Sequence, residues 1–192
     1  MSVLHKILNS ILFSISVLVF SSPALAGPLC ALGQGGHGGA DIPATPLAHQ
    51  QMRSVAQALC QKFKCPYFDF AQTQTTKNAM AWSDASGNYI RYNSSFMNGE
   101  LQNRGFYATT GILAHELGHL IDFSVNTANQ NQATREATAD RYAGCAFALA
   151  GEPRENLLAL AQSLQAMGSS PGYPTAQERV ALVLIGYNQC SN

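Results

Sequence analysis

Two histidines and a glutamate lie within five positions of this chain, as His115, Glu116 and His119. Histidines four positions apart lie on one face of an α-helix, one turn above the other, so both imidazoles can bind the same cation. Glu116 lies about 100° round the helix from His115, where its carboxylate can reach an attacking water without occupying the cation. Zinc-dependent hydrolysis needs two neutral nitrogen ligands and a nearby base, so the pattern predicts a metal-binding helix.

The residues around this motif favour a helix that is buried on its apolar side. Gly118 costs about 1 kcal/mol of helix propensity relative to Ala, so a glycine in mid-helix indicates that another element approaches closely. The alternative is a solvent-facing helix with two incidental histidines, and the apolar neighbours disfavour it. These neighbours are Ile112, Leu113, Leu117, Leu120 and Ile121.

A catalytic zinc site needs a third protein ligand, and no histidine follows His119. We therefore expect a downstream carboxylate, with Glu136 and Asp140 as a pair four positions apart on a second helix. Glu136 can bind the metal while Asp140 accepts the outer N–H of a ligand histidine. A pair on a solvated helix face is the alternative, but like charges at this spacing repel. Asp122 shares the histidine face, but its short side chain starts two turns from His115, so we expect it to support the site or the helix end. The other downstream candidates are Glu152, Glu155 and Glu178.

The order of His115, Glu116 and His119, then Glu136, Ala139 and Asp140, resembles the gluzincin metallopeptidases. It is most similar to the HtpX and CAAX-prenyl-protease group with its small soluble bacterial relatives. The resemblance implies a zincin-like fold, one zinc ion per chain, Glu136 as the third ligand and Asp140 as its supporting residue.

The same group carries a late His-Pro with an Arg six residues after the His, near the start of a terminal helix. The matching stretch here is Tyr173, Pro174 and Arg179, with Tyr in place of His. A phenol can still donate a hydrogen bond to an oxyanion, so either Tyr173 or Arg179 is expected to stabilise it. The alternative for Tyr173 is a turn residue before a proline.

Residues 1–26 have the pattern of a secretory signal, with Lys6, an apolar run from 7 to 20, and Ala24 and Ala26 at a cleavage site. The run is short for a membrane span, and no later stretch reaches eighteen apolar residues. We expect a soluble exported protein, periplasmic or secreted. Residues 27–45 are predicted to be a flexible Gly-rich segment, and residues 46–192 one domain.

Export would place all five cysteines in an oxidising compartment. Cys60 and Cys65 are expected to close a small loop at a helix end, and Cys145 and Cys190 to tie the second zinc helix to the C-terminal region. Cys30 is then left over. A structural zinc site is the competing interpretation, but a second closely spaced Cys or His pair is missing.

The apolar periodicity predicts a mainly helical α+β domain with one small antiparallel sheet. The strand from Tyr89 to Tyr92 comes last before the zinc helix. The resemblance implies that this strand forms the rim of the cleft and that an extended peptide or protein substrate adds to its edge. A formal net charge of zero, with 11% charged residues, argues against nucleic acid. The expected helices cover 46–63, 95–102, 107–122, 133–149, 154–167 and 175–187, and the expected strands 67–73, 79–82 and 89–92.

Together these patterns predict an exported zinc metalloendopeptidase with Glu116 as general base. One rival is a non-catalytic exported module that keeps zinc as a structural clip and binds another protein. Glu116 argues against it, because a closed structural site has no use for an unligated carboxylate, whereas a fourth protein ligand would favour it. A second rival is a zinc amidase acting on cell-wall peptides, since the same chemistry cleaves any amide.

Overall fold

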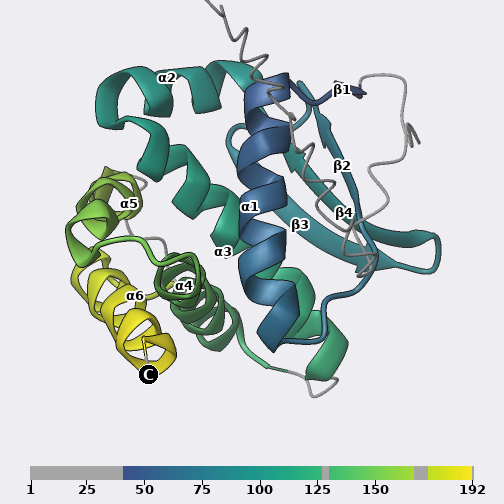
Figure 1. The fold of residues 1–192 in the computed structure, drawn as a ribbon. Coiled ribbons are helices and arrows are strands. Elements are labelled where there is room, and N and C mark those ends of the chain that lie inside the picture. The colour runs from purple at the N-terminus through teal and green to yellow at the C-terminus, as the bar shows by residue number, and fades with distance from the viewer. Residues whose placement is uncertain (1–40, 127–129, 167–172, 192) are drawn as a thin grey trace, which may run out of the picture.

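The computed structural model describes residues 41–126, 130–166 and 173–191. The predicted signal, Cys30 and most of the Gly-rich segment lie outside these ranges. The described chain is mainly helical with one small sheet, as expected for α+β (Figure 1). In chain order the elements are β1 (Ile42–Pro43), α1 (Pro46–Lys62), β2 (Asp69–Gln72), β3 (Ala79–Asp84), β4 (Gly87–Tyr92), α2 (Ser94–Arg104), α3 (Phe106–Val125), α4 (Gln132–Leu149), the short 3₁₀ turn η1 (Arg154–Asn156), α5 (Leu157–Ala166) and α6 (Ala176–Cys190).

Side-chain caps explain where three of the helices begin. Thr45 accepts a hydrogen bond from the backbone N–H of Ala48 before α1, and Asn131 accepts one from Thr134 before α4. At α6, Thr175 and Glu178 form a reciprocal capping box. Each cap satisfies backbone N–H groups that have no partner inside the helix. The predicted starts at 46, 133 and 175 each lie within one residue of the observed starts.

The sheet has the order β1-β2-β4-β3 and is mixed. β3 and β4 form the predicted antiparallel hairpin, but β4 also pairs in parallel with β2. The prediction of an antiparallel sheet is wrong. After β2 the chain forms β3 two strand positions away, and β4 then fills the position between them, where it runs parallel to β2. β1 lies within residues 27–45, the segment predicted to be flexible, and pairs antiparallel with β2.

The strand from Tyr89 to Tyr92, predicted to be an edge, is an interior strand. It belongs to β4, which is hydrogen-bonded on both sides. Among the described residues the edge next to α3 is β3. Tight hairpin pairing with β3 uses one side of β4 and parallel pairing uses the other, so β4 has no free edge for a peptide.

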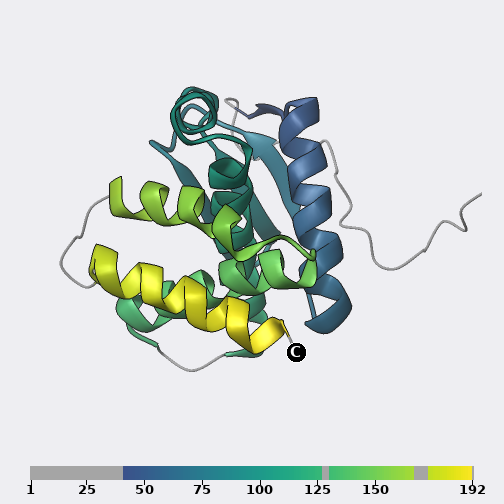
Figure 2. The same cartoon turned by 60° about the vertical axis from the view of Figure 1, so that its left-hand side comes forward.

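Helix α3 is the centre of the molecule. It contacts α1, α2, α4, α5, β3 and β4, and residues 111–122 are buried without interruption. Figure 2 shows α3 between the sheet and the group formed by α4, α5 and α6. A Cβ added at Gly118 would lie 2.8 Å from Cβ of Tyr142 and 3.1 Å from Cα of Ala139. This confirms that Gly118 permits the close approach of another element, which is α4.

Helices α4 and α6 also approach to backbone contact. A Cβ at Gly144 would overlap the carbonyl group of Val183, and a Cβ at Gly186 would overlap that of Arg141. Any larger side chain at either position would force these helices apart. The two glycines therefore fix α6 against the helix that carries Glu136 and Asp140.

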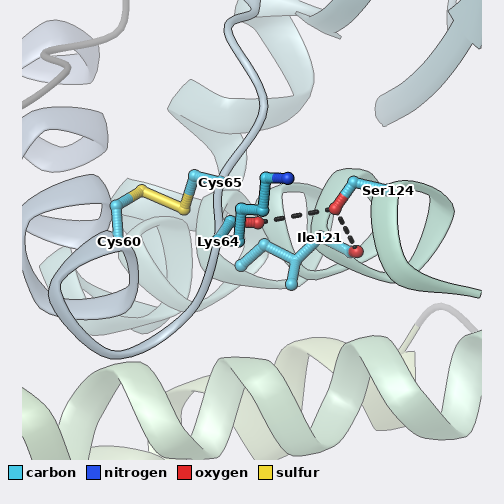
Figure 3. Close-up of a disulfide and its surroundings, with 5 residues drawn as sticks. All are labelled: Cys60, Lys64, Cys65, Ile121 and Ser124. Carbon is cyan, nitrogen blue, oxygen red and sulfur yellow. Dashed lines mark hydrogen bonds between the residues drawn. A yellow bond between two sulfur atoms is a disulfide. The ribbon is translucent and has the colours of Figure 1, made fainter.

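Both predicted disulfides are present, Cys60–Cys65 and Cys145–Cys190, each with a Cα–Cα distance of 5.2 Å. Figure 3 shows the Cys60–Cys65 turn beside the end of α3. The hydroxyl of Ser124 lies 2.7 Å from the carbonyl oxygen of Ile121 and 3.4 Å from that of Lys64. One disulfide thus closes a turn that contacts α3, and the other joins α4 to α6. Within the described ranges, none of the helices combines the length and apolar character needed to cross a membrane.

Candidate metal centre

His115, His119 and Glu136 form a buried cluster whose ligand atoms all lie within 4.8 Å of one another. Nε2 of His115 is 3.3 Å from Oε2 of Glu136, and Nε2 of His119 is 3.5 Å from Oε1 of Glu136. Helix α3 supplies both imidazoles and α4 supplies the carboxylate, as the spacing predicted. The other carboxylates considered as ligands, including Asp122, do not join this cluster. Asp122 instead accepts a hydrogen bond of 2.6 Å from the side chain of Asn126.

The cluster fits a small divalent metal ion. A tetrahedral ion with bonds of about 2.0–2.1 Å holds its ligand atoms about 3.3 Å apart, close to the two separations measured here. Within the described ranges, a fourth His, Cys, Asp or Glu does not join the three. Three donors and an open side are what a catalytic site requires.

The charges around the cluster also suit a divalent cation. Glu116, Glu136 and Asp140 are all buried carboxylates, and the buried guanidinium beside them is that of Arg179. When the imidazoles are neutral, these three carboxylates and one guanidinium carry a net charge of about −2. Because buried charges need compensation, a doubly charged cation would balance the site.

Asp140 orients His115 from behind, as predicted. Its Oδ1 lies 2.9 Å from Nδ1 of His115, and the carboxylate has no solvent exposure. A carboxylate can only accept here, so Nδ1 carries the proton and Nε2 is directed at the metal position.

Arg179 makes a bidentate contact with this same carboxylate. Its Nε and Nη2 donate hydrogen bonds of 2.8 Å each to the two oxygens of Asp140. Nη2 also lies 3.5 Å from Oε2 of Glu136. Arg179 comes from the first turns of α6, so a third helix takes part in holding the two that supply the ligands.

Tyr173 and Gln132 stand at the exposed side of the cluster. Nε2 of Gln132 donates a hydrogen bond of 2.7 Å to Oε1 of Glu136 and lies 3.5 Å from the phenol oxygen of Tyr173. The Tyr173 side chain is 42% exposed and lines the cleft. Sequence reasoning missed Gln132, although its position one helical turn before Glu136 was a usable signal.

Burial and close pairing shift the pKa values of the site. Burial raises the pKa of the Glu116 carboxyl. Burial also opposes the charged form of His115, but hydrogen bonds to Asp140 and Glu136 outweigh it and raise the pKa of His115 to about 10. For Glu136, burial alone would raise the pKa, but hydrogen bonds and charge interactions with His115 and His119 together outweigh it and hold the pKa well below its ordinary value. In the metal-free chain a proton on His115 therefore compensates the carboxylates.

The cluster opens into a cleft of about 520 Å³. His115, Glu116 and His119 of helix α3 line it, together with residues of β3 such as Met80. Tyr173 also lines the cleft. An extended chain could therefore lie between an edge strand and a buried carboxylate next to the metal ligands.

Comparison of the chain with protein-family models, with curated proteins and with solved structures finds no match in any of the three. The functional assignment of the cleft therefore comes from its own geometry and chemistry.

Proposed function

We propose that this chain is an exported zinc peptidase with a zincin-like, gluzincin-type site, and that it hydrolyses peptide bonds in the cleft above α3. The observation that carries the proposal is the convergence of His115, His119 and Glu136 on one point, with Glu116 beside them at the floor of an open cleft. A zinc ion held by these residues would polarise a scissile carbonyl and lower the pKa of the attacking water to about 7.

Glu116 is the proposed general base. It follows His115 directly in α3, so the helix fixes its carboxylate at the edge of the histidine face. Because burial raises its pKa, the carboxylate is a stronger base than an exposed glutamate. It would accept a proton from the attacking water and later give that proton to the leaving amine.

Tyr173 is the proposed oxyanion donor. Of the two candidates from the sequence, Arg179 spends its Nε and Nη2 donors on Asp140 and is only 5% exposed. Tyr173 lies in the cleft wall with its phenol 3.5 Å from Gln132, so its hydroxyl can donate toward substrate. Arg179 then acts as a positioning residue, through Asp140 and His115.

The proposed substrate is an extended stretch of peptide or protein that pairs with β3. Strand β3 takes over the role that sequence reasoning gave to the strand from Tyr89 to Tyr92. Its residues Ala79, Met80 and Ala81 line the cleft, and Met80 is 42% exposed. Pairing along a strand edge uses main-chain hydrogen bonds, so it accepts varied sequences.

Two observations support an active enzyme over a structural clip. Among the described residues the cluster has three protein ligands, and Glu116 remains beside them unligated. The buried Glu116 would cost stability in a site without chemistry, since an unpaired buried carboxylate is unfavourable. The amidase alternative shares this machinery and differs only in the amide that is cleaved.

Export is proposed from the predicted signal at residues 1–26 together with the two disulfides. Disulfides persist in oxidising compartments such as the bacterial periplasm or the extracellular space.

The test is metal analysis of the purified chain, combined with digestion of a peptide library. Wild type should hold one zinc per chain. Glu116→Gln should keep that zinc and lose hydrolysis by at least about 100-fold, the typical contribution of a general base. Glu136→Ala should lose the zinc, whereas Glu155→Gln, an exposed glutamate outside the cleft, should behave as wild type. Undiminished hydrolysis by Glu116→Gln would exclude this mechanism.

A further inference from the structure

The cleft carries a cation beyond the metal-binding cluster, next to Phe123. Along α3, Ile112 precedes the metal ligands and Phe123 follows them, and both line the cleft. These residues are eleven positions apart, which is roughly 16 Å along a helix. Arg135 also lines the cleft, with its guanidinium against the ring of Phe123. A peptide lying across Glu116 toward Phe123 would therefore reach a cation.

Arg135 is held in place by aromatic stacking. Its guanidinium carbon lies 5.1 Å from the centre of the Phe123 ring. That ring in turn stacks on His119 with centroids 5.9 Å apart and planes 16° from parallel. These contacts place the guanidinium over an aromatic ring that itself stacks on His119, one of the residues of the cluster.

The guanidinium of Arg135 is only partly engaged by the described residues. Its side chain makes no hydrogen bond with them, and its Nη1 forms an ion pair at 3.7 Å with Oδ2 of Asp122. This Oδ2 is buried and has no hydrogen-bond partner. The ion pair occupies one end of the guanidinium, and Nε and Nη2 remain for an incoming group. The Arg135 side chain is 24% exposed, so an incoming group can reach it while much of the surrounding water is excluded.

We propose that Arg135 binds a carboxylate of the substrate and so gives the cleft a preference for acidic peptides. This inference rests on the proposed peptidase function. A guanidinium fork pairs with a carboxylate through two parallel hydrogen bonds, and such a pair is strongest when it is partly removed from water. The carboxylate can come from an Asp or Glu side chain or from the C-terminus of the peptide.

A purely structural role for Arg135 makes a different prediction. If Arg135 only balanced the buried charge of Asp122, its loss would lower stability and leave the choice of substrate unchanged. If it binds substrate, its loss changes the ratio of affinities for acidic and neutral peptides. That ratio is insensitive to a general loss of folded protein.

The experiment measures binding and cleavage separately. Zinc-loaded full chain carrying Glu116→Gln is titrated with fluorescent peptides that have Glu or Gln at single positions, each with a free or an amidated C-terminus. The same peptides are then digested by zinc-loaded wild type. The carboxylate form should bind, and be cleaved, about tenfold or more better than its neutral counterpart, as expected for a charged hydrogen-bonded pair. Comparison of the Glu/Gln pairs with the acid/amide pairs identifies the source of the carboxylate.

Variants then assign the preference to one residue. Adding Arg135→Gln should bring the ratio close to one, and Arg135→Glu should favour peptides with Lys at the same position. Arg141→Gln is the matched control, because it removes an exposed arginine from the same helix outside the cleft.

Equal binding of acidic and neutral peptides, or a preference that survives Arg135→Gln or falls equally in Arg141→Gln, overturns the proposal. If wild type cleaves none of the peptides while the zinc-loaded Glu116→Gln chain still binds the acidic ones through Arg135, the peptidase function fails and the binding site stands.

Discussion

Replacing Gly118 with Ala tests how tightly the metal centre depends on the contact between α3 and α4. The new Cβ would lie 2.8 Å from Cβ of Tyr142 and 3.1 Å from Cα and O of Ala139. Non-bonded carbon atoms prefer about 3.5 Å or more, so the shortfalls are about 0.7 Å and about 0.4 Å. Ala139 contributes backbone atoms, which cannot rotate away. Helix α4 must therefore retreat by about half an ångström.

This retreat should affect metal binding more than folding. Overpacking costs about 1–3 kcal/mol, but replacing Gly with Ala in a helix returns about 1 kcal/mol, so the net loss of stability is about 0–2 kcal/mol. Ala139 lies on α4 between Glu136 and Asp140, and metal–ligand distances tolerate only about 0.2 Å. We expect zinc affinity to fall about 10–100-fold, the range seen when groups that support metal ligands are altered.

The assay is competition for zinc against a chromophoric chelator, alongside urea unfolding of the metal-free chain. Gly99→Ala is the matched control, since Gly99 is inside α2 and a Cβ there would meet nothing within 4 Å. The Gly99→Ala variant should gain up to about 1 kcal/mol in its free energy of unfolding, and its zinc affinity should not change. If Gly118→Ala gains stability as Gly99→Ala does and binds zinc as tightly as wild type, the α3–α4 contact at Gly118 does not govern metal binding.

Two further predictions concern stability. In the metal-free chain, the pKa of His115 is raised from 6.5 to about 10, so its stabilising contribution is complete below pH 6.5 and is lost as pH rises toward 10. The thermal midpoint should fall over this range, less steeply in His115→Gln; parallel profiles would contradict the assignment. The Cys145–Cys190 disulfide spans 45 positions and Cys60–Cys65 spans 5, so loop entropy predicts that replacing each pair with serines costs about 4 and about 2 kcal/mol respectively. Denaturant unfolding measures both, and equal losses would show that loop length does not govern them.

The parts of the molecule that could be predicted from sequence are those fixed by short-range geometry. Helical spacing alone places His115 and His119 on one face, and the same spacing places Glu136 one turn before Asp140. Gly118 signalled a close helix contact without naming the partner. Burial of residues 111–122 on all sides could not be foreseen, because it depends on six other elements that pack against α3.

The sheet shows what local pattern leaves undetermined. Alternation of apolar and polar residues assigns faces to a strand, but it does not choose the neighbours of that strand. The hairpin between β3 and β4 was predictable from its turn, whereas the parallel pairing of β2 with β4 depends on the path of residues 73–78. The edge was therefore assigned to Tyr89–Tyr92 when it belongs to β3.

Arg179 illustrates the same limit inside the site. Resemblance selected the residue, but its partner is Asp140, a carboxylate 39 positions earlier that has no solvent exposure. A fully buried carboxylate that lost its guanidinium would be destabilising by several kcal/mol, so Asp140 can orient His115 only while α6 is docked. The glycine contacts between α4 and α6 and the Cys145–Cys190 disulfide maintain that docking. A helix that supplies no metal ligand is thus required for the ligand geometry, and the ability to bind metal should be lost with α6 even though His115, His119 and Glu136 all precede it.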